Sequence, residues 1–152
     1  MPRILFIPIF LICFAACTSQ KKTTAPTQPS YGDDRTTEVE LLNSQTFKLY
    51  ERTKDSTYGY TVQNPVKVGG KNDGPLNERR FLNGLLGPKY ETIEYERVGS
   101  CCPFKTPNGL FGDSGLLDKY KVYWQGAKDT LILYFNMYDK GNLKIPVGFN
   151  AR

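Results

Sequence analysis

Residues 73–88 read DGPLNERRFLNGLLGP, and this stretch has the start and stop signals of a helix. Asp73 is a residue type that caps helix N-termini, and Pro75 suits the first turn because its missing N–H has no partner there. Gly87 followed by Pro88 ends the pattern, since proline cannot continue a helix. The sequence therefore predicts one main helix at this position.

The predicted helix has an apolar face. Phe81 and Leu85 lie four positions apart and share this face, as do Leu82 and Leu86. Three polar residues fall outside the apolar stripe: Glu78, Arg79 and Asn83. One side of the helix is therefore expected to pack on a partner.

Three later segments alternate apolar and polar side chains, as half-buried strands do: residues 92–98, 118–125 and 130–138. Residues 125–129, which include Gly126, are expected to form a hairpin loop between the last two strands. Alternation on either side of the polar turn 53–56 predicts another hairpin across residues 47–62. We expect an α+β domain in which the helix packs on an antiparallel sheet of four to six strands.

The N-terminus has the pattern of a secretion signal. Residues 4–14 are almost entirely apolar, but a helix of eleven residues spans only about 16 Å, roughly half of a bilayer's hydrocarbon core. Ala15 and Ala16 precede Cys17 in a pattern that resembles the lipobox of bacterial lipoproteins. We expect residues 1–16 to be a lipoprotein signal peptide and Cys17 to be acylated; the alternative is an ordinary signal peptide with an incidental cysteine.

The predicted lipid anchor sets the expected location and domain organisation. Two or more acyl chains on Cys17 would hold the protein durably on a membrane. Thr18 follows Cys17 where an inner-membrane retention signal favours Asp, so we expect the outer membrane, facing the periplasm. Residues 17–44 are mostly polar and predict a flexible tether, which leaves residues 45–152 as the small α+β domain.

Composition excludes several kinds of site. The chain has no histidine, so Ser-His-Asp and Cys-His catalysis and imidazole metal sites are excluded. Without the signal segment, 19 basic residues face 15 acidic ones, a net charge of +4. The basic residues are scattered among acids, so we expect no nucleic-acid partner. We expect no cofactor and no metal site.

Cys101 and Cys102 are the only cysteines after Cys17, and unpaired thiols of exported proteins are normally oxidised. Three interpretations stay open: a vicinal disulfide that stiffens a turn, two thiols with structural or interchain roles, and a redox or soft-metal site. Adjacent Cα atoms lie only about 3.8 Å apart, so a bond between the pair would close a strained ring.

Two further groups are candidate binding residues. Gly69, Gly70, Lys71 and Gly74 precede the helix, where free backbone N–H groups can bind an anion, although a simple turn is the favoured interpretation. Tyr134, Asn136 and Tyr138 share one strand face, which is either an exposed surface for glycan or protein or a face covered by other chain. The covered face is slightly favoured.

Several motifs together resemble a family of small, uncharacterised flavobacterial-type envelope lipoproteins. They are residues 58–60, 64–70, 77–80, 100–104 and 136–139. Some members are labelled 2-dehydro-3-deoxyphosphooctonate aldolase, but that enzyme is a (β/α)₈ barrel of at least about 200 residues. Roughly 110 exported residues cannot close that barrel, so the resemblance implies no aldolase site.

The sequence favours a membrane-anchored envelope lipoprotein with a non-catalytic binding or structural domain. Its expected partners are the bilayer, through acylated Cys17, and an envelope protein or cell-wall glycan. The alternative is a thiol- or disulfide-dependent factor or enzyme centred on Cys101 and Cys102. An enzyme is the less favoured class.

Overall fold

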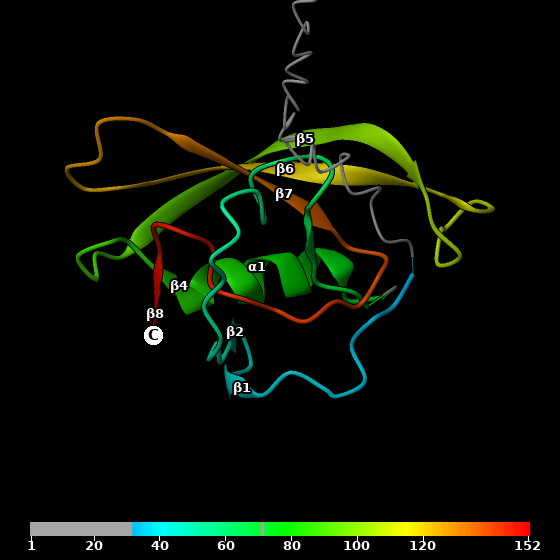
Figure 1. Cartoon of the computed structure of the whole chain (residues 1–152), viewed down its shortest axis with the longest axis horizontal. Helices are drawn as coiled ribbons and strands as arrows, with labels where there is room; N and C mark the ends of the chain where they lie inside the picture. The colour runs from blue at the N-terminus through cyan, green and yellow to red at the C-terminus, as the bar shows by residue number, and fades with distance from the viewer. Residues whose placement is uncertain (1–31, 71) are drawn as a thin grey trace, which may run out of the picture.

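The computed structural model describes residues 32–70 and 72–152, and within them one helix lies beneath a four-stranded sheet (Figure 1). The predicted signal peptide 1–16, Cys17 and the loop residue Lys71 lie outside the described residues. No helix of the described part is long and apolar enough to cross a membrane. The domain is α+β, as expected, with more strand than helix.

The main sheet has the strand order β3-β7-β6-β5. Its strands are β3 (Val66–Lys67), β5 (Ile93–Lys105), β6 (Ser114–Trp124) and β7 (Leu131–Asn136). The pairs β5–β6 and β6–β7 are antiparallel, and the predicted loop at residues 125–129 joins β6 to β7. The expectation of a wholly antiparallel sheet is wrong, because β3 runs parallel to β7. The helix and three strands separate these two along the chain, so no hairpin fixes their relative direction.

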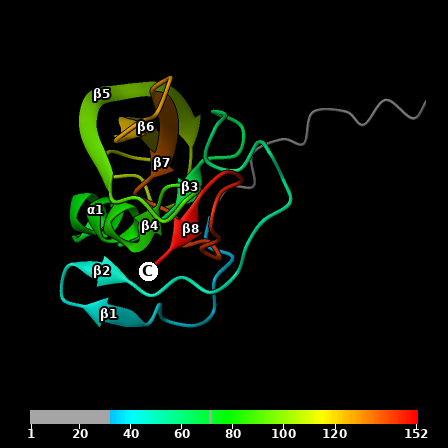
Figure 2. The same cartoon turned by 90° about the vertical axis from the view of Figure 1, so that its left-hand side faces the viewer.

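Two small sheets complete the fold. The strands β1 (Leu41–Asn43) and β2 (Thr46–Phe47) form a hairpin, and β4 (Leu85–Leu86) pairs with β8 (Asn150–Ala151). Both views place the β1–β2 hairpin on the side of the helix that faces away from the main sheet (Figures 1 and 2). The helix is therefore covered from two sides.

The predicted helix is α1 (Gly74–Gly84), and it ends earlier than expected. Leu85 adopts an extended conformation because it pairs with Ala151 in the C-terminal strand. A side chain at Gly84 would come within 2.7 Å of the Phe47 carbonyl oxygen, so glycine lets the backbone of β2 approach the helix. Tertiary pairing thus overrides the Gly87–Pro88 stop signal.

The hairpin expected across residues 47–62 is wrong. Residues 56–64 form consecutive turns, in which the Asp55 carboxylate accepts hydrogen bonds from the Thr57 backbone and the Asn64 side chain. Such local side-chain bonds compete with strand pairing. Leu49 and Tyr58 are buried nonetheless. The apolar pattern of this segment therefore indicates which residues are buried, but it does not indicate a strand.

The predicted apolar face of the helix is confirmed. Phe81, Leu82 and Leu85 are fully buried, and Phe81 meets Phe135 of β7 edge to face at 5.7 Å between ring centroids. Phe135 makes a second such contact with Tyr120 of β6, at 5.3 Å. This aromatic cluster joins α1 to the two central strands.

The domain begins earlier than residue 45. The backbone N–H groups of Asp34 and Arg35 both donate to the Lys140 carbonyl oxygen, at 2.8 and 3.1 Å, and the Asp34 carboxylate pairs with Lys67 at 2.8 Å. Residues 33–43, which the sequence assigns to the tether, therefore lie against the domain. These residues are mostly polar, so the apolar pattern of the sequence does not indicate that they pack on the domain.

The aromatic cluster predicts the cost of opening the core. Phe81→Ala should lower the free energy of unfolding by about 3–5 kcal/mol, because it removes a fully buried ring and leaves a cavity. Phe111→Ala is the matched control, since that ring is exposed in solution, and it should change stability by less than about 0.5 kcal/mol. Urea unfolding measures both. Equal effects of the two substitutions would contradict the core described here.

Candidate functional site

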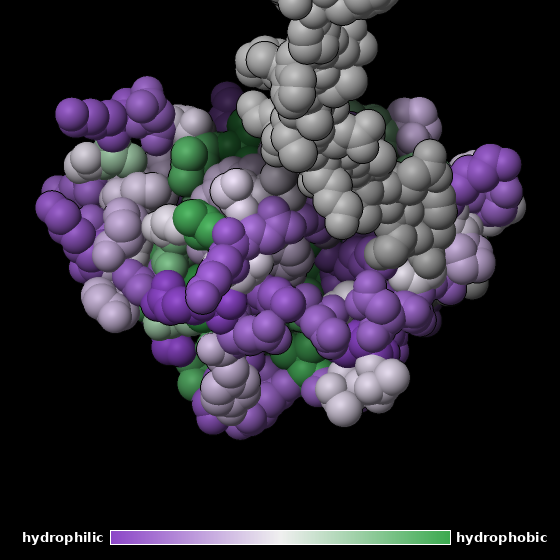
Figure 3. All heavy atoms as spheres, in the orientation of Figure 1, coloured by the Kyte–Doolittle hydropathy of each residue, from purple (hydrophilic) through white to green (hydrophobic). Residues whose placement is uncertain are grey.

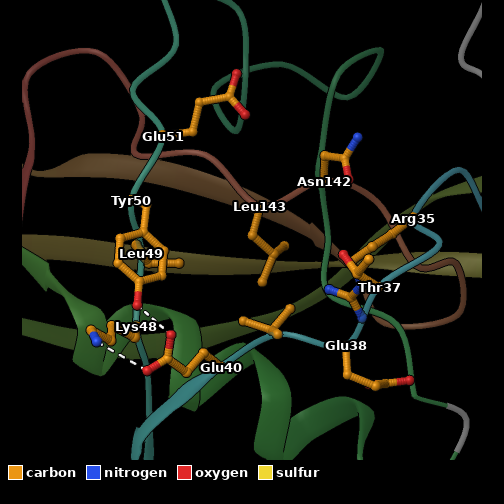
Figure 4. Close-up of a pocket in the computed structure, with 11 residues that line it drawn as sticks. Arg35, Thr37, Glu38, Glu40, Lys48, Leu49, Tyr50, Glu51, Asn142 and Leu143 are labelled. Carbon is orange, nitrogen blue, oxygen red and sulfur yellow. Dashed lines mark hydrogen bonds and ion pairs between the residues drawn. The ribbon is translucent and has the colours of Figure 1, made fainter.

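A groove of about 360 Å³ lies where two segments from near the start of the domain, residues 35–40 and 48–51, meet residues 142–143 (Figure 4). The first segment is the docked N-terminal chain, the second follows β2, and the third precedes β8. Leu49 and Leu143 contribute apolar surface. The remaining lining residues include both acids and bases, among them Glu38, Glu40, Glu51, Arg35 and Lys48.

Tyr50 is an exposed aromatic side chain held in a fixed orientation on this groove. The ring is 65% exposed, yet its hydroxyl donates to the Glu40 carboxylate. The Lys48 Nζ lies 2.9 Å from Glu40 Oε1 and 5.1 Å from the centroid of the Tyr50 ring (Figure 4). Glu40 therefore holds both the Tyr50 hydroxyl and the Lys48 ammonium group, while the Tyr50 ring stays exposed to solvent.

These contacts stabilise the charged forms of both groups. The hydrogen bond from Tyr50 and then the contact with Lys48 hold the pKa of Glu40 below its usual range. Tyr50 and Glu40 in turn raise the pKa of Lys48 to about 12. Both groups keep their charge across the neutral pH range, so the groove presents a carboxylate, an ammonium and an aromatic ring together.

Arg35 forms the wall between this groove and a second cavity of about 230 Å³. Its Nη1 and Nη2 donate to the carbonyl oxygens of Gly141 and Val68 at 3.4 and 3.5 Å, which are long hydrogen bonds. Its buried Nε has no hydrogen-bond partner among the described residues. Burial lowers the pKa of Arg35, and the neighbouring Glu38 and Asp33 oppose that effect.

The glycine-rich loop before α1 is tightly packed. A side chain at Gly69 would come within 2.3 Å of Lys140, and one at Gly70 within 2.5 Å of Asn77 Nδ2, and both glycines have positive φ. The Asn77 side chain donates to the Gly69 carbonyl oxygen at 2.9 Å. Gly74 packs equally closely on Met137. Glycine is needed at these positions because of the close packing and, at Gly69 and Gly70, because of the turn geometry. This packing gives no support to an anion site.

The three residues expected on one face of β7 do not share one exposed surface. Asn136 is 2% exposed, and its amide donates to Asp139 at 2.9 Å while its oxygen accepts from the Tyr138 backbone. Tyr134 is half-buried, and Tyr138 packs edge-on against Phe104. Asn136 is therefore a turn-capping residue and not a contact residue.

Asp139 is a buried carboxylate that the sequence did not single out. Besides Asn136, the Thr106 hydroxyl and the Asn108 amide donate to it, the latter at 3.0 Å. Asn108 also donates to Asp33 at 2.9 Å. These bonds fasten the loop between β5 and β6 to the end of β7 and to the docked N-terminal segment.

Cys101 and Cys102 are joined in a vicinal disulfide, with Cα atoms 3.7 Å apart. They lie in β5, an edge strand, where the pairing with β6 shifts register between Cys101 and Pro103. Cys102 has φ of +58°, an unusual value for a residue with a side chain. Bulges and proline at a sheet edge discourage pairing with another strand, and both cysteines stay half-exposed.

A charged cluster adjoins the disulfide. Arg97 holds both carboxylate oxygens of Asp118, at 2.9 and 2.7 Å, and the Ser100 hydroxyl donates to the same carboxylate at 2.6 Å. Asp118 is nearly fully buried. A bidentate arginine is a strong partner for a buried carboxylate, so this pair offsets part of the cost of burying Asp118.

Glu78 of α1 is fully buried beside this cluster, although the sequence placed it outside the apolar stripe. The Tyr120 hydroxyl donates to its Oε2 at 2.9 Å, whereas Oε1 has no hydrogen-bond partner within the described chain. Burial and the nearby Asp118 carboxylate raise the pKa of Glu78 to about 7. Its spacing of three and four residues before Phe81 and Leu82 was the signal that could have found it.

Metal binding and known relatives offer no further guidance. In residues 32–70 and 72–152, no group of three or more Cys, Asp or Glu side chains could hold a metal ion. Comparison with protein-family models, with curated proteins and with solved structures found no match. What the domain does must therefore be inferred from its own residues.

The buried Glu78 predicts a pH dependence of stability. Its pKa is higher in the folded protein than in the unfolded chain, so its favourable contribution is complete below about pH 4.5 and is lost as the pH rises through about 7. Relative to Glu78→Gln, the wild-type protein should lose on the order of 2–3 kcal/mol between pH 4.5 and 8. Urea unfolding at several pH values measures the difference.

Glu96→Gln is the control for this experiment, because Glu96 is a glutamate of β5 whose side chain is exposed. It should keep the wild-type pH dependence. A Glu78→Gln protein that keeps that dependence unchanged would contradict the assignment of the titration to Glu78.

Proposed function

We propose that this chain is a lipid-anchored envelope protein whose domain is a non-catalytic binding module. The anchor rests on the short apolar segment and on Cys17 behind two alanines. The resemblance to small envelope lipoproteins supports the same conclusion. Thr18 favours the outer membrane, with the domain facing the periplasm.

The observation that carries the binding role is the exposed but immobilised Tyr50 ring. An aromatic side chain fixed by Glu40 and Lys48 loses little conformational freedom when a partner contacts it. Large apolar groups on a surface commonly mark a place of contact. The groove around Tyr50 is therefore the proposed binding site.

The partner that suits this groove best is a cell-wall glycan. The apolar face of a sugar ring can stack on Tyr50, and hydroxyl and amide groups can bond to Glu38, Glu40 and Lys48. Arg35 and Lys48 are balanced by three carboxylates, so the lining does not select a highly anionic polymer. An envelope protein is the other expected partner.

A second candidate function is a disulfide-dependent factor centred on Cys101 and Cys102. The half-exposed vicinal disulfide on an edge strand favours it, because a thiol could reach the bond from solvent. Arg97 lies four residues before Cys101 in the same strand and donates to the hydroxyl of Ser100, the residue next to Cys101. Its positive charge would favour a thiolate at that position.

Acylation is tested directly in cells. Labelled palmitate should enter the wild-type protein and should not enter Cys17→Ala, and the variant should leave the membrane fraction. Cys101→Ser combined with Cys102→Ser is the control and should be labelled normally. Equal labelling of wild type and Cys17→Ala would refute the anchor.

Binding is tested by co-sedimentation with purified peptidoglycan. Tyr50→Ala should weaken the binding by about tenfold, because the stacking surface is lost. Tyr90→Ala removes an equally exposed tyrosine outside the groove and should bind as wild type. Unchanged binding by Tyr50→Ala would exclude this groove, and binding lost only in the double cysteine variant would favour the second candidate.

A further inference from the structure

The loop between β5 and β6 projects an apolar tip from the domain. Phe111 is 91% exposed and Leu110 48% exposed, and Leu116 at the start of β6 is 45% exposed. Figure 1 shows this loop at one extremity of the molecule, far from α1. The face seen in Figure 3 is by contrast mostly hydrophilic, with small separate apolar spots. We call Leu110 and Phe111 the apolar tip.

The tip is a structured projection. The Thr106 backbone N–H donates to the Asp113 carbonyl oxygen at 2.9 Å, and a side chain at Gly109 would come within 2.5 Å of the Ser114 carbonyl oxygen. The Thr106 side chain is bonded to buried Asp139, which fixes the base of the loop. The loop could therefore turn Phe111 inward only by breaking these contacts, and its exposure is built into the fold.

The chain that leads to Cys17 enters the domain beside this loop. A side chain at Gly32, the first described residue, would lie 3.5 Å from Pro107, and the neighbouring Asp33 accepts a hydrogen bond from Asn108 at 2.9 Å. Fourteen residues lie between Cys17 and Gly32. A coil of that length reaches on average about 20–25 Å, so a membrane that holds Cys17 lies within reach of the apolar tip.

We propose that the apolar tip inserts into the interface of the bilayer to which Cys17 is anchored, so that the domain is held in one orientation on the membrane. This inference rests on the proposed lipid anchor. Burying one phenylalanine and one leucine gives only weak partitioning by itself. The tether supplies the high local concentration that makes such weak insertion effective.

The charges around the tip indicate that insertion is driven by apolar burial. Lys105 and Asp113, at the base of the loop, are paired with each other at 3.5 Å. No excess of positive charge faces the membrane from this loop. Insertion should therefore occur on neutral phosphatidylcholine and depend little on salt.

Orientation on the membrane would also place the proposed groove. The N-terminal segment 33–43 runs from the tip region to the groove, where Arg35 and Glu38 form part of the lining. With the tip in the lipid, the β1–β2 hairpin lies on the part of the domain that α1 separates from β5 and β6 (Figure 2), and Tyr50 follows the end of β2 by three residues. The groove would then remain accessible to a partner.

Tryptophan fluorescence tests the inserted tip. In a Trp124→Phe background, Phe111→Trp places the sole tryptophan at the tip, and Tyr90→Trp places it at the opposite end of β5. The chain from Cys17 onward, which contains every described residue, is coupled through the Cys17 thiol to a maleimide lipid in phosphatidylcholine vesicles. Part of the phosphatidylcholine carries brominated acyl chains, which quench only tryptophans that reach the hydrocarbon.

The tip tryptophan should be quenched by roughly half and shift its emission to the blue, whereas the tryptophan at position 90 should change little. Uncoupled protein should show far weaker quenching at the tip. Equal quenching at positions 111 and 90 would overturn the inference. The inference would also be overturned if brominated lipid did not quench the tip tryptophan while native envelopes shielded it from solvent. In that case a protein, and not the bilayer, would cover the tip.

Chemical coupling makes this test independent of acylation in cells. If palmitate labelling fails while the coupled tip is still quenched, the proposed anchor is wrong and the membrane affinity of the tip stands. If labelling succeeds while the tip is not quenched, the anchor stands and the inserted tip is wrong.

Discussion

The packing of α1 on the main sheet is the constraint on which the rest of the molecule depends. Phe81 meets Phe135, and Phe135 meets Tyr120, so one helix and two central strands share a single aromatic cluster. The other face of α1 carries the β1–β2 hairpin, and its C-terminal end leads into the β4–β8 pair. Roughly 110 residues can form only one core. The two small sheets therefore take their positions from this one helix.

Polar contacts between residues far apart in the sequence fix the positions of the surface segments around this core. The groove is assembled from chain segments that lie about a hundred residues apart, and backbone bonds from Asp34 and Arg35 to Lys140 hold them together. Asp139 gathers Thr106, Asn108 and Asn136 at the base of the β5–β6 loop. Each buried carboxylate needs partners to offset its desolvation, so these networks determine where the loops lie. The exposed Tyr50 and Phe111 are thus presented by rigid surroundings.

Local pattern predicted what is local in this fold. The start of α1, its apolar face and the β6–β7 hairpin follow from spacing and turn residues. The parallel pairing of β3 with β7 does not, because it depends on contacts between segments with α1, β5 and β6 between them. The sequence pattern assigns residues 33–43 to the tether because they lack an apolar periodicity. What holds this segment on the domain is backbone and ion-pair contact with Lys140 and Lys67. Glu78 was misjudged because its polarity was given more weight than its spacing from Phe81 and Leu82. The vicinal disulfide was one of three possibilities, and the groove around Tyr50 had no sequence signature.

We propose that this domain holds an envelope partner at the groove around Tyr50 while its N-terminus is fixed to a membrane. A photoreactive amino acid at Thr37 tests it most directly, because Thr37 lines the groove and is itself exposed. In living cells, illumination should join the protein at this position to peptidoglycan, and muramidase digestion should release the product. The same amino acid at Tyr90 should give no such product. Identical crosslinking at the two positions, or none at either, would show that peptidoglycan does not bind at this groove.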